Sequence, residues 1–484
     1  MKNSMKKQIY NPIFPLSEYV PDGEPHVFGD RVYLYGSHDK ENGDRFCMLD
    51  YTVWSAPVAD LSDWICHGVT YKKTQDKRAT KEKTPDYYAP DCVRGKDGRF
   101  YLYYAAMGPN VRPFGPMSVA VSDVPAGPFE YLGDIRYKDG TPVLKYLTND
   151  PAVLNDGGRI WLYYGWGLGR DFRSKFFSPV LNFVQSKLFC RSVKEIKSTK
   201  PSILDCAVVE LEDDMMTVKD EPKAVLPSKT SAKKGAAIYD HAFYEAPSIR
   251  KFGNLYYLVY SSGENNELAY ATSLYPDRGF EYRGVIISNS DLGLRGNRQP
   301  KNNAGTIHGG IECINGKYYV FYHRCTNNTD FSRQACAEPI EIEPDGTIRQ
   351  VEVTTQGLNG KPLQAYGKYP AAICCQLYNP ELKAKRGNGN VDKYPCLTFD
   401  GENRIVHGMR KGTKAVYKYF DFSGHDKLSI TAKGTGKIKV NGSLIAVDSA
   451  NWSQYVCELH DKGKHALTIE TAEGVVDILT LNFV

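Results

Sequence analysis

The sequence lacks the features that assign a chain to several common functional classes. No apolar run is long enough to span a bilayer. No phosphate-binding loop, kinase signature or Ser/His/Asp nucleophile elbow occurs. None of the 12 cysteines forms a Cys-x-x-Cys pair, which argues against a zinc or redox site. The net charge of +5 is small and dispersed, so we expect neither nucleic acid nor a membrane as a partner.

The chain also shows no recognisable secretory signal. Basic residues occur near the N-terminus, but no apolar stretch follows them. The cysteines are scattered, and many lie inside strand patterns, where a free thiol behaves as a small hydrophobic group. We therefore expect a cytoplasmic, bacterial protein with reduced cysteines. The alternative is a mature secreted protein whose signal segment has been removed.

The sequence does contain five copies of one pattern. In each copy a polar or acidic residue opens a short strand, a Gly/Asp/Asn turn follows, and an aromatic-rich strand completes the unit. The aromatic strands read RVYLYGS, RFYLYYA, RIWLYYG, LYYLVYS and KYYVFYH. We take Val27, Val93, Val153, Ile249 and Ile311 as equivalent positions in the first strands. Strand-only repeats at this spacing predict a five-bladed β-propeller, with an insertion within residues 170–234.

The character of the chain changes near residue 357. Short alternating strands such as KLSITAKG and HALTIETA follow, separated by Gly, Asn and Asp. This pattern is typical of a β-sandwich. We therefore predict an all-β protein, with a propeller over residues 1–357 and a sandwich over residues 358–484. The segment 384–394 has the composition of an exposed loop.

Acidic residues recur at the start of the repeats. Asp150 and Glu245 open two of them, whereas Asp22 and Glu24 compete for this place in the first copy. Repeat register favours Glu24, and Asp22 lies two residues earlier on the same face. The inner strands of a propeller begin near its axis, so these carboxylates should converge and repel one another. One would then be protonated while another stays ionised, a pairing that suits cleavage of a glycosidic bond.

Other polar residues near the predicted strand mouths have two readings each. Asp91 is a turn cap or a substrate hydrogen-bonding group, and His308 is a structural histidine or a ligand on the axis. Arg324 forms a surface ion pair, or it binds a sugar hydroxyl or an active-site carboxylate.

Three further candidates for substrate contact lie near the ends of the repeat strands. His38 follows the first aromatic strand. Trp166 and Phe243 either form a sugar platform or pack between blades.

The motifs NPIFP, PDGEPHVFGDRVYLYGSHD, YYAPD, NDPAVLNDGGRIWLYYGWG, YEAPSI and HGGIECINGKYYVFYHR occur in this order. Together they resemble glycoside hydrolase family 43 over roughly residues 10–355. That family consists of inverting five-bladed propellers that act on arabinose- and xylose-containing polysaccharides. The resemblance implies that Asp150 tunes the acid and that Glu245 is the acid. It favours Asp22 over Glu24 as the base, and it matches His308 to a histidine that in many members lies beside a calcium ion.

The C-terminal part resembles carbohydrate-binding modules of family 6, through GTKAVYKYFDFSG and LTIETAEGVVDILTLNF. On this reading Trp452, Tyr455 and Tyr417 are candidates for stacking on sugars. The alternative is that the sandwich only packs against the propeller and shapes its pocket.

These observations predict an inverting exo-glycosidase without an organic cofactor. Its substrates would be arabinoxylan-derived oligosaccharides, from which it removes terminal α-L-arabinofuranosyl and also β-D-xylosyl residues. One alternative is a family member that acts on another glycoside, such as a galactoside. Another is a non-catalytic carbohydrate-binding propeller, and a protein-interaction scaffold is a third.

Overall fold

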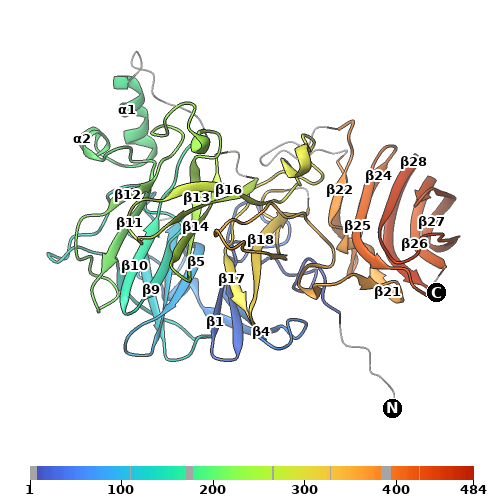
Figure 1. The fold of residues 1–484 in the computed structure, drawn as a ribbon, viewed down its shortest axis with the longest axis horizontal. Helices are drawn as coiled ribbons and strands as arrows, with labels where there is room; N and C mark the ends of the chain where they lie inside the picture. Colours follow the sequence, from blue (N-terminus) through green and yellow to red (C-terminus); the bar gives the residue numbers. More distant parts are fainter. Residues whose placement is uncertain are drawn as a thin grey trace.

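The computed structural model describes residues 8–108, 111–169, 178–263, 266–327, 329–382, 394–424 and 426–484. The predicted exposed loop at 384–394 therefore lies almost entirely outside the described residues. Figure 1 shows a propeller, coloured from blue to yellow, beside a sandwich in orange and red. No helix in the described ranges is both long and apolar enough to cross a membrane.

Five antiparallel sheets form the propeller, and their strands follow one another in chain order. Each of the first four blades has four strands, and the fifth has three. The strands of blades 1 and 2 are β1 (Glu24–Phe28), β2 (Arg31–Tyr35), β3 (Tyr51–Pro57), β4 (Ile65–Tyr71), β5 (Asp86–Arg94), β6 (Phe100–Met107), β7 (Ser118–Ser122) and β8 (Glu130–Asp134). Those of blades 3 to 5 are β9 (Ala152–Asp156), β10 (Arg159–Tyr164), β11 (Cys206–Leu211), β12 (Lys223–Leu226), β13 (Phe243–Phe252), β14 (Leu255–Ser262), β15 (Glu267–Ser273), β16 (Glu281–Ser288), β17 (Ile311–Ile314), β18 (Lys317–Cys325) and β19 (Arg333–Ile340).

Apolar side chains hold neighbouring blades together. The aromatic strands alternate between two faces, so each sheet presents apolar residues to both of its neighbours. One cluster lies between each pair of blades; for example, Leu102 belongs to the cluster shared by blades 1 and 2, and Leu162 to that shared by blades 2 and 3. The repeated aromatic strand of the sequence is therefore the packing unit of the propeller.

The N-terminal segment closes the propeller along the last strand of blade 5. The backbone N–H of Ile13 donates to the carbonyl of Ala335 at 2.9 Å. The Asn11 side chain donates to the carbonyls of Ala337 and Thr354, both at 3.0 Å, and accepts from the Ala337 N–H at 3.0 Å. Blade 5 thus gains its fourth element from the start of the chain.

The hairpin register corrects part of the predicted repeat alignment. Leu34 and Leu162 hold the same place in their aromatic strands, yet Leu34 pairs with Pro25 while Leu162 pairs with Val153. Val27 is therefore two residues out of register. Val93 is one residue out, because Cys92 pairs with Leu102. A hairpin can shift by two residues and keep the same face toward the core, which is why the apolar pattern alone gave the wrong alignment in blade 1.

The insertion in blade 3 contains two helices, α1 (Ser178–Leu188) and α2 (Val193–Ser198). Figure 1 shows them at one outer edge of the propeller. Phe189 and Ile196 pack against Leu147 and Leu204, so the insertion has its own small core beside blade 3. A Ser192–Glu195 capping box begins α2.

The C-terminal part is one sheet system of nine strands around a second large apolar core. Its strands are β20 (Leu363–Gln364), β21 (Gly367–Pro370), β22 (Gln376–Tyr378), β23 (Cys396–Asp400), β24 (Asn403–Arg410), β25 (Lys414–Asp421), β26 (Lys427–Val440), β27 (Ser443–Glu458) and β28 (Lys464–Phe483). Long β26–β28 strands fold back on the short ones and enclose the core, as the alternating sequence pattern indicated.

We expect the Asn11→Ala substitution to lower the free energy of unfolding by about 1–3 kcal/mol, because it leaves buried partners of a three-way amide contact unpaired. Urea or thermal unfolding measures this change. Asn359→Ala is the matched control, since that amide contacts only the nearby carbonyl of Lys361 in an exposed loop. Equal stability of the two variants would show that the N-terminal segment does not close the propeller.

Candidate active site

The innermost strands bring five equivalent residues together at one end of the propeller axis. In every blade the fourth residue of the aromatic pattern, for example Leu34 or Leu162, pairs with a residue of the inner strand. The ring member lies three positions before that inner-strand residue. We call them the upper ring: Asp22, Ala89, Asp150, Ala246 and His308. The first four have positive φ values of 59°, 33°, 47° and 61°, an unfavourable conformation for residues with a Cβ atom. Strain repeated at matched positions points to a functional site.

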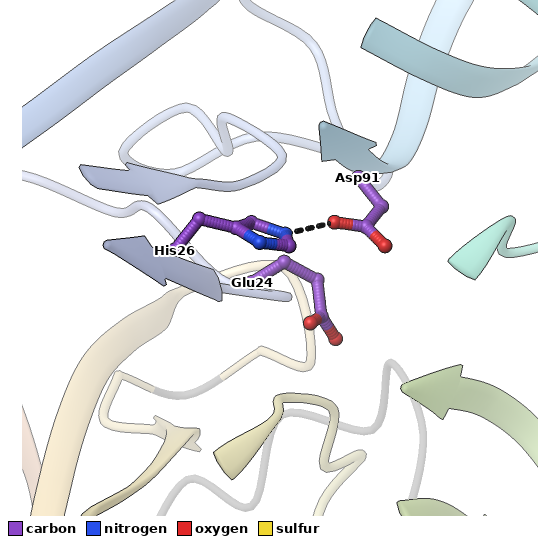
Figure 2. A group of neighbouring side chains, drawn as sticks. All are labelled: Glu24, His26 and Asp91. Carbon is purple, nitrogen blue, oxygen red and sulfur yellow. Dashed lines mark hydrogen bonds and ion pairs between the residues drawn. The ribbon is translucent and has the colours of Figure 1, made fainter. Parts of the chain in front are cut away.

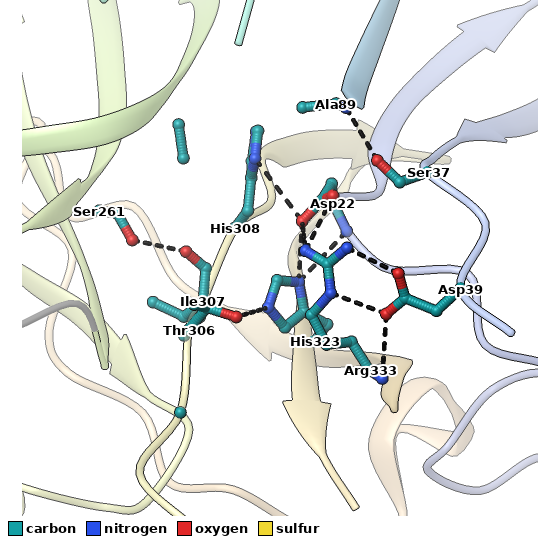
Figure 3. A network of polar contacts seen from close by, with 12 residues as sticks. Asp22, Ser37, Asp39, Ala89, Ser261, Thr306, Ile307, His308, His323 and Arg333 are labelled. Atoms are coloured by element: carbon teal, nitrogen blue, oxygen red, sulfur yellow. Dashed lines mark hydrogen bonds and ion pairs between the residues drawn. The ribbon is translucent and has the colours of Figure 1, made fainter. Parts of the chain in front are cut away.

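Asp22 lies at the centre of a polar network that Figure 3 shows. Its two carboxylate oxygens accept from Nη1 of Arg333 at 2.8 and 3.0 Å. Nδ1 of His308 lies 3.8 Å and Nδ1 of His323 lies 3.3 Å from Oδ1 of Asp22. Burial by itself would raise the pKa of Asp22, but Arg333 and the two histidines outweigh it and lower the pKa to about 2. Asp22 is therefore an ionised carboxylate throughout the physiological range.

The Nε and Nη2 atoms of Arg333 bind a second carboxylate, that of Asp39. Its Nε donates to Oδ2 of Asp39 at 2.8 Å, and its Nη2 donates to Oδ1 at 2.9 Å. The ring of Phe46 covers its face at 4.6 Å. Arg333 was missed in the sequence because it opens β19, a strand without a repeat motif.

Both histidines of the network are neutral. Nδ1 of His323 accepts from the backbone N–H of Asp22 at 3.2 Å, so its proton lies on Nε2, which faces Oγ1 of Thr306 at 3.2 Å. Burial lowers the pKa of His323 to about 3 and that of His308 to about 4. His323 is structural, whereas Nε2 of His308 remains directed toward the axis, 3.9 Å from Oε1 of Glu24.

Asp150 and Glu245 form a second acidic pair on the other side of the ring. Asp150 is buried and accepts from the N–H of Ala246 at 3.1 Å, whereas Glu245 is only half-buried. Burial and then the charges of Glu245 and Asp22 raise the pKa of Asp150 well above its usual value. A buried carboxyl group beside a second carboxyl group thus favours its protonated form. Glu245 is the member that solvent can reach.

Two residues further along the inner strands lies a lower ring, made up of Glu24, Asp91, Ala152, Ser248 and Gly310. Oε2 of Glu24 accepts from Ser248 Oγ at 2.9 Å. A Cβ atom on Gly310 would lie 2.7 Å from that oxygen, so only glycine fits here. The register thus separates Asp22, beside Asp150 and His308, from Glu24 in the layer beneath.

The two acidic residues of the lower ring, Glu24 and Asp91, lie beside His26, as Figure 2 shows. Oδ1 of Asp91 lies 2.5 Å from Nε2 of His26, and Oδ2 accepts from the Val153 N–H at 2.7 Å. Nη2 of Arg250 donates to Oε2 of Glu24 at 3.1 Å. Burial, strengthened by Asp91 and opposed by Arg250, raises the pKa of Glu24 to about 8. Asp91 is thus engaged with the protein on both oxygens.

The structure places Arg324 and Phe243 away from the ring. Arg324 follows His323 on β18, so its side chain points to the opposite face of the strand. Its Nη1 donates to the carbonyls of Cys375 at 2.6 Å and Cys374 at 3.2 Å, in the contact with the sandwich. Phe243 is fully buried in the cluster between blades 3 and 4. Neither residue contacts the carboxyl groups of the upper ring. The structure therefore does not support the predicted contact of Arg324 or Phe243 with a sugar in this site.

Trp166 and His38 lie outside the ring but near its surroundings. Trp166 is half-buried against the rings of Phe114 at 5.3 Å and Tyr244 at 6.0 Å, and Tyr244 precedes Glu245. This position leaves Trp166 available to a ligand at the acid. Nδ1 of His38 instead lies 2.8 Å from the carbonyl of Asp50, within the loop between β2 and β3.

Comparison with known protein families matches most of the propeller. The model of glycosyl hydrolases family 43 matches residues 9–179 and 188–348. A relative from Thermoclostridium stercorarium, named xylosidase/arabinosidase, is 41% identical over 493 residues, which cover 96% of each chain.

Solved structures show the same architecture. One is a family 43 β-xylosidase/α-arabinofuranosidase from a compost metagenome, in a calcium-free form with xylotriose. It is 28% identical, has a TM-score of 0.52, and covers 70% of this chain and 97% of its own. An arabinoxylan arabinofuranohydrolase from Bacillus subtilis, with cellotetraose, is 19% identical with a TM-score of 0.51. It covers 98% of this chain and 97% of its own, so the likeness of fold extends over propeller and sandwich together.

Proposed function

The chain belongs to glycosyl hydrolase family 43, and we propose that it removes terminal α-L-arabinofuranosyl and β-D-xylosyl residues from arabinoxylan-derived oligosaccharides by an inverting mechanism. The observation that carries this proposal is the pair of opposite pKa shifts in the upper ring. The pKa of Asp22 is lowered to about 2, whereas the pKa of Asp150, which lies beside Glu245, is raised well above its usual value. An inverting glycosidase needs such a base and such an acid on opposite sides of one bond.

Each residue of the ring then has a defined role. Asp22 accepts a proton from the attacking water, and Arg333 keeps Asp22 ionised. Glu245 donates its proton to the leaving oxygen because it is the accessible member of its pair. Asp150 raises the proton affinity of that pair through its like charge. The names of the relatives support pentose substrates, and the half-buried Trp166 beside Tyr244 supplies an aromatic surface for a sugar.

We propose that a calcium ion binds between the two rings. Oε1 of Glu24 is buried without a hydrogen-bond partner among the described residues, and Nε2 of the neutral His308 lies 3.9 Å from it. A carboxylate oxygen at this place suits calcium, with waters to complete the shell. The bound ion would supply positive charge beneath the base, and no bond of the reaction is made to it.

A second candidate set for a metal is less suitable. Ligand atoms of Glu24, His26 and Asp91 all lie within 4.8 Å of one another. However, His26 and Asp91 bond directly at 2.5 Å, and Nη2 of Arg250 lies only 3.4 Å from Nε2 of His26. The ligand atoms of His26 and Asp91 are thus already engaged with each other and with the protein, whereas Oε1 of Glu24 has no hydrogen-bond partner among the described residues.

Hydrolysis of p-nitrophenyl α-L-arabinofuranoside and β-D-xyloside tests the assignment of the base. We expect Asp22→Asn to lower kcat by about 10²–10⁴-fold, the usual contribution of a general base. Glu338→Gln is the matched control, because Glu338 is a buried carboxyl outside the site whose pKa is raised by burial to about 8. A loss in Glu24→Gln with activity kept in Asp22→Asn would move the base to the lower ring. If the wild type cleaves neither glycoside, the protein acts on another sugar or only binds carbohydrate.

The pH dependence of kcat/KM tests the acid pair. Because the pKa of Asp22 is about 2, activity should not fall on the acid side until the pH is very low. It should fall on the alkaline side as the raised pKa of the pair is passed and the proton is lost. In Asp150→Asn the like charge is absent, so the alkaline fall should move to lower pH by on the order of one unit or more. An unchanged alkaline limb would show that Asp150 does not tune the acid.

Calcium should raise the melting temperature of the wild type relative to a chelated sample, because an ion bound only by the folded state stabilises it. The melting temperature of Glu24→Gln should not respond, since the amide removes the charge that faces His308. The Asp213→Asn variant, which alters an exposed carboxylate, controls for calcium bound at the surface. A calcium response that persists in Glu24→Gln would place the ion elsewhere.

A further inference from the structure

Two groups of contacts between the sandwich and the propeller lie apart from each other. In the first, the linker patch, Lys418 and Gln376 contact Asp291 at 3.3 and 2.6 Å. In the second, the rim patch, Arg404 of β24 and Leu397 of β23 reach loops at the end of the propeller that carries the active site. The contacts of the linker patch join residues 85 and 127 positions apart in the chain, and the Arg404–Glu41 contact of the rim patch joins residues 363 positions apart.

Arg404 is a deeply buried cation in the rim patch. Only 2% of its side chain is exposed. Its Nη1 lies 3.3 Å from Oε2 of Glu41, and its Nη2 lies 3.5 Å from Oγ1 of Thr326. The guanidinium also lies over the rings of Tyr19 at 5.2 Å and Phe399 at 4.8 Å. One side chain of the sandwich thus contacts two loops of the propeller, from blades 1 and 5.

These two loops carry Arg333, which bonds Asp22, and Asp39, which bonds Arg333. Glu41 follows two residues after Asp39, in the loop between β2 and β3. Thr326 begins the loop between β18 and β19, at whose end Arg333 lies. Asn327 of the second loop donates to Glu41 of the first at 3.1 Å.

The sandwich also holds the second loop through its backbone. The Leu397 N–H donates to the carbonyl of Thr326 at 2.8 Å. Thr326 in turn bonds across its own loop, since its N–H donates to the carbonyl of Ser332 at 3.1 Å. Ser332 directly precedes Arg333. The sandwich is therefore connected, through Thr326, to the residue next to the arginine that pairs with Asp22.

We propose that Arg404 is a positioning residue for the catalytic base: it fixes the two loops whose other ends hold Asp39 and Arg333 against Asp22. This inference rests on the proposed function for its catalytic consequence, but not for the structural coupling. A buried ion pair adds little net stability compared with well-packed apolar groups. The pair does fix the relative position of its two partners, because any arrangement that separates them leaves a buried charge unpaired, at a large cost in free energy. A pair placed across two domains therefore selects one arrangement of both loops.

The aromatic residues first considered for sugar stacking are engaged within the sandwich. Tyr417 is fully buried, and its hydroxyl donates to the carbonyl of Ala371 at 2.8 Å. Nε1 of Trp452 donates to Asp400 at 3.0 Å, and Lys433 lies over its ring at 4.6 Å. These contacts favour a supporting role for the sandwich over stacking on a sugar by these two residues.

Hydrogen exchange of the intact protein tests the coupling without any substrate. We expect Arg404→Met to accelerate exchange in residues 38–47 and 326–333, and Arg404→Lys to restore part of the protection. Lys418→Met is the matched control: it also removes a cation from the interface, but in the linker patch, so exchange in those two loops should stay as in the wild type. If Arg404→Met does not fold, Glu41→Gln removes the same ion pair from the propeller side.

Kinetics of the same variants test the consequence for the base. With the p-nitrophenyl pentoside that the wild type cleaves, we expect kcat/KM of Arg404→Met to fall roughly three- to thirty-fold. The fall should be in kcat rather than in KM, because the proposed effect of Arg404 is on the position of the base.

The outcomes separate the two proposals. Unchanged exchange in both loops, or equal acceleration in Lys418→Met, would overturn the positioning role. Faster exchange with an unaltered kcat would confine Arg404 to stability and would also overturn it. If the wild type cleaves no pentoside but the loops respond only to Arg404, the coupling stands and the proposed substrate class fails.

Discussion

Arg333 lies between two buried carboxylates, Asp22 and Asp39, and the site depends on this interaction. Burial alone would drive both groups to take up protons, because an isolated charge is poorly solvated inside a protein. A guanidinium has five N–H donors in a fixed plane, so Arg333 can make four bonds to the two carboxylates, one more than the three donors of a lysine allow. The geometry of one side chain thus sets the charge of the base and ties together loops from blades 1 and 5.

The propeller places different chemistry in successive layers of the same strands. Residues two positions apart point in the same direction along a strand. Asp22 and Glu24 therefore both face the axis, yet their surroundings differ. At Asp22 the charge of Arg333, together with the two histidines, outweighs burial and the carboxylate stays ionised. At Glu24 burial outweighs the share of Arg250 and, with the charge of Asp91, raises the pKa to about 8. The distribution of cations between layers decides which carboxylate can act as a base.

Much of this arrangement could be predicted from the sequence, for identifiable reasons. The five aromatic strands are the packing units between blades, so their pattern indicated the propeller. Asp150 and Glu245 could be found because they open repeats. The choice between Asp22 and Glu24 could not be made from apolar pattern, since a shift of two residues conserves the face. Only the pairing of Leu34 with Pro25 places Asp22 in the ring of Asp150.

The sequence pattern points to Arg324 instead of Arg333 because it carries only local information. Arg324 lies next to a repeat motif, which makes it a candidate for sugar binding in the sequence. Alternation along β18 turns its side chain toward the sandwich. Arg333 lies on a strand without a motif, and its partners Asp22 and Asp39 are separated from it by most of the propeller. A contact of that range leaves no local signal.

The position of Arg333 also explains why the site is asymmetric. Arg333, His308 and His323 all come from blade 5 and face Asp22 of blade 1, while Asp150 and Glu245 come from blades 3 and 4. If the guanidinium lay at the centre of the ring, it would favour ionisation of all the carboxyl groups, and no acid would remain. Because the cation lies on one side, the pKa of Asp22 is lowered while that of Asp150 is raised. That side is also where the N-terminal segment closes the propeller and where Arg404 docks, so the forces that join blades 1 and 5 are those that keep the proposed base in place.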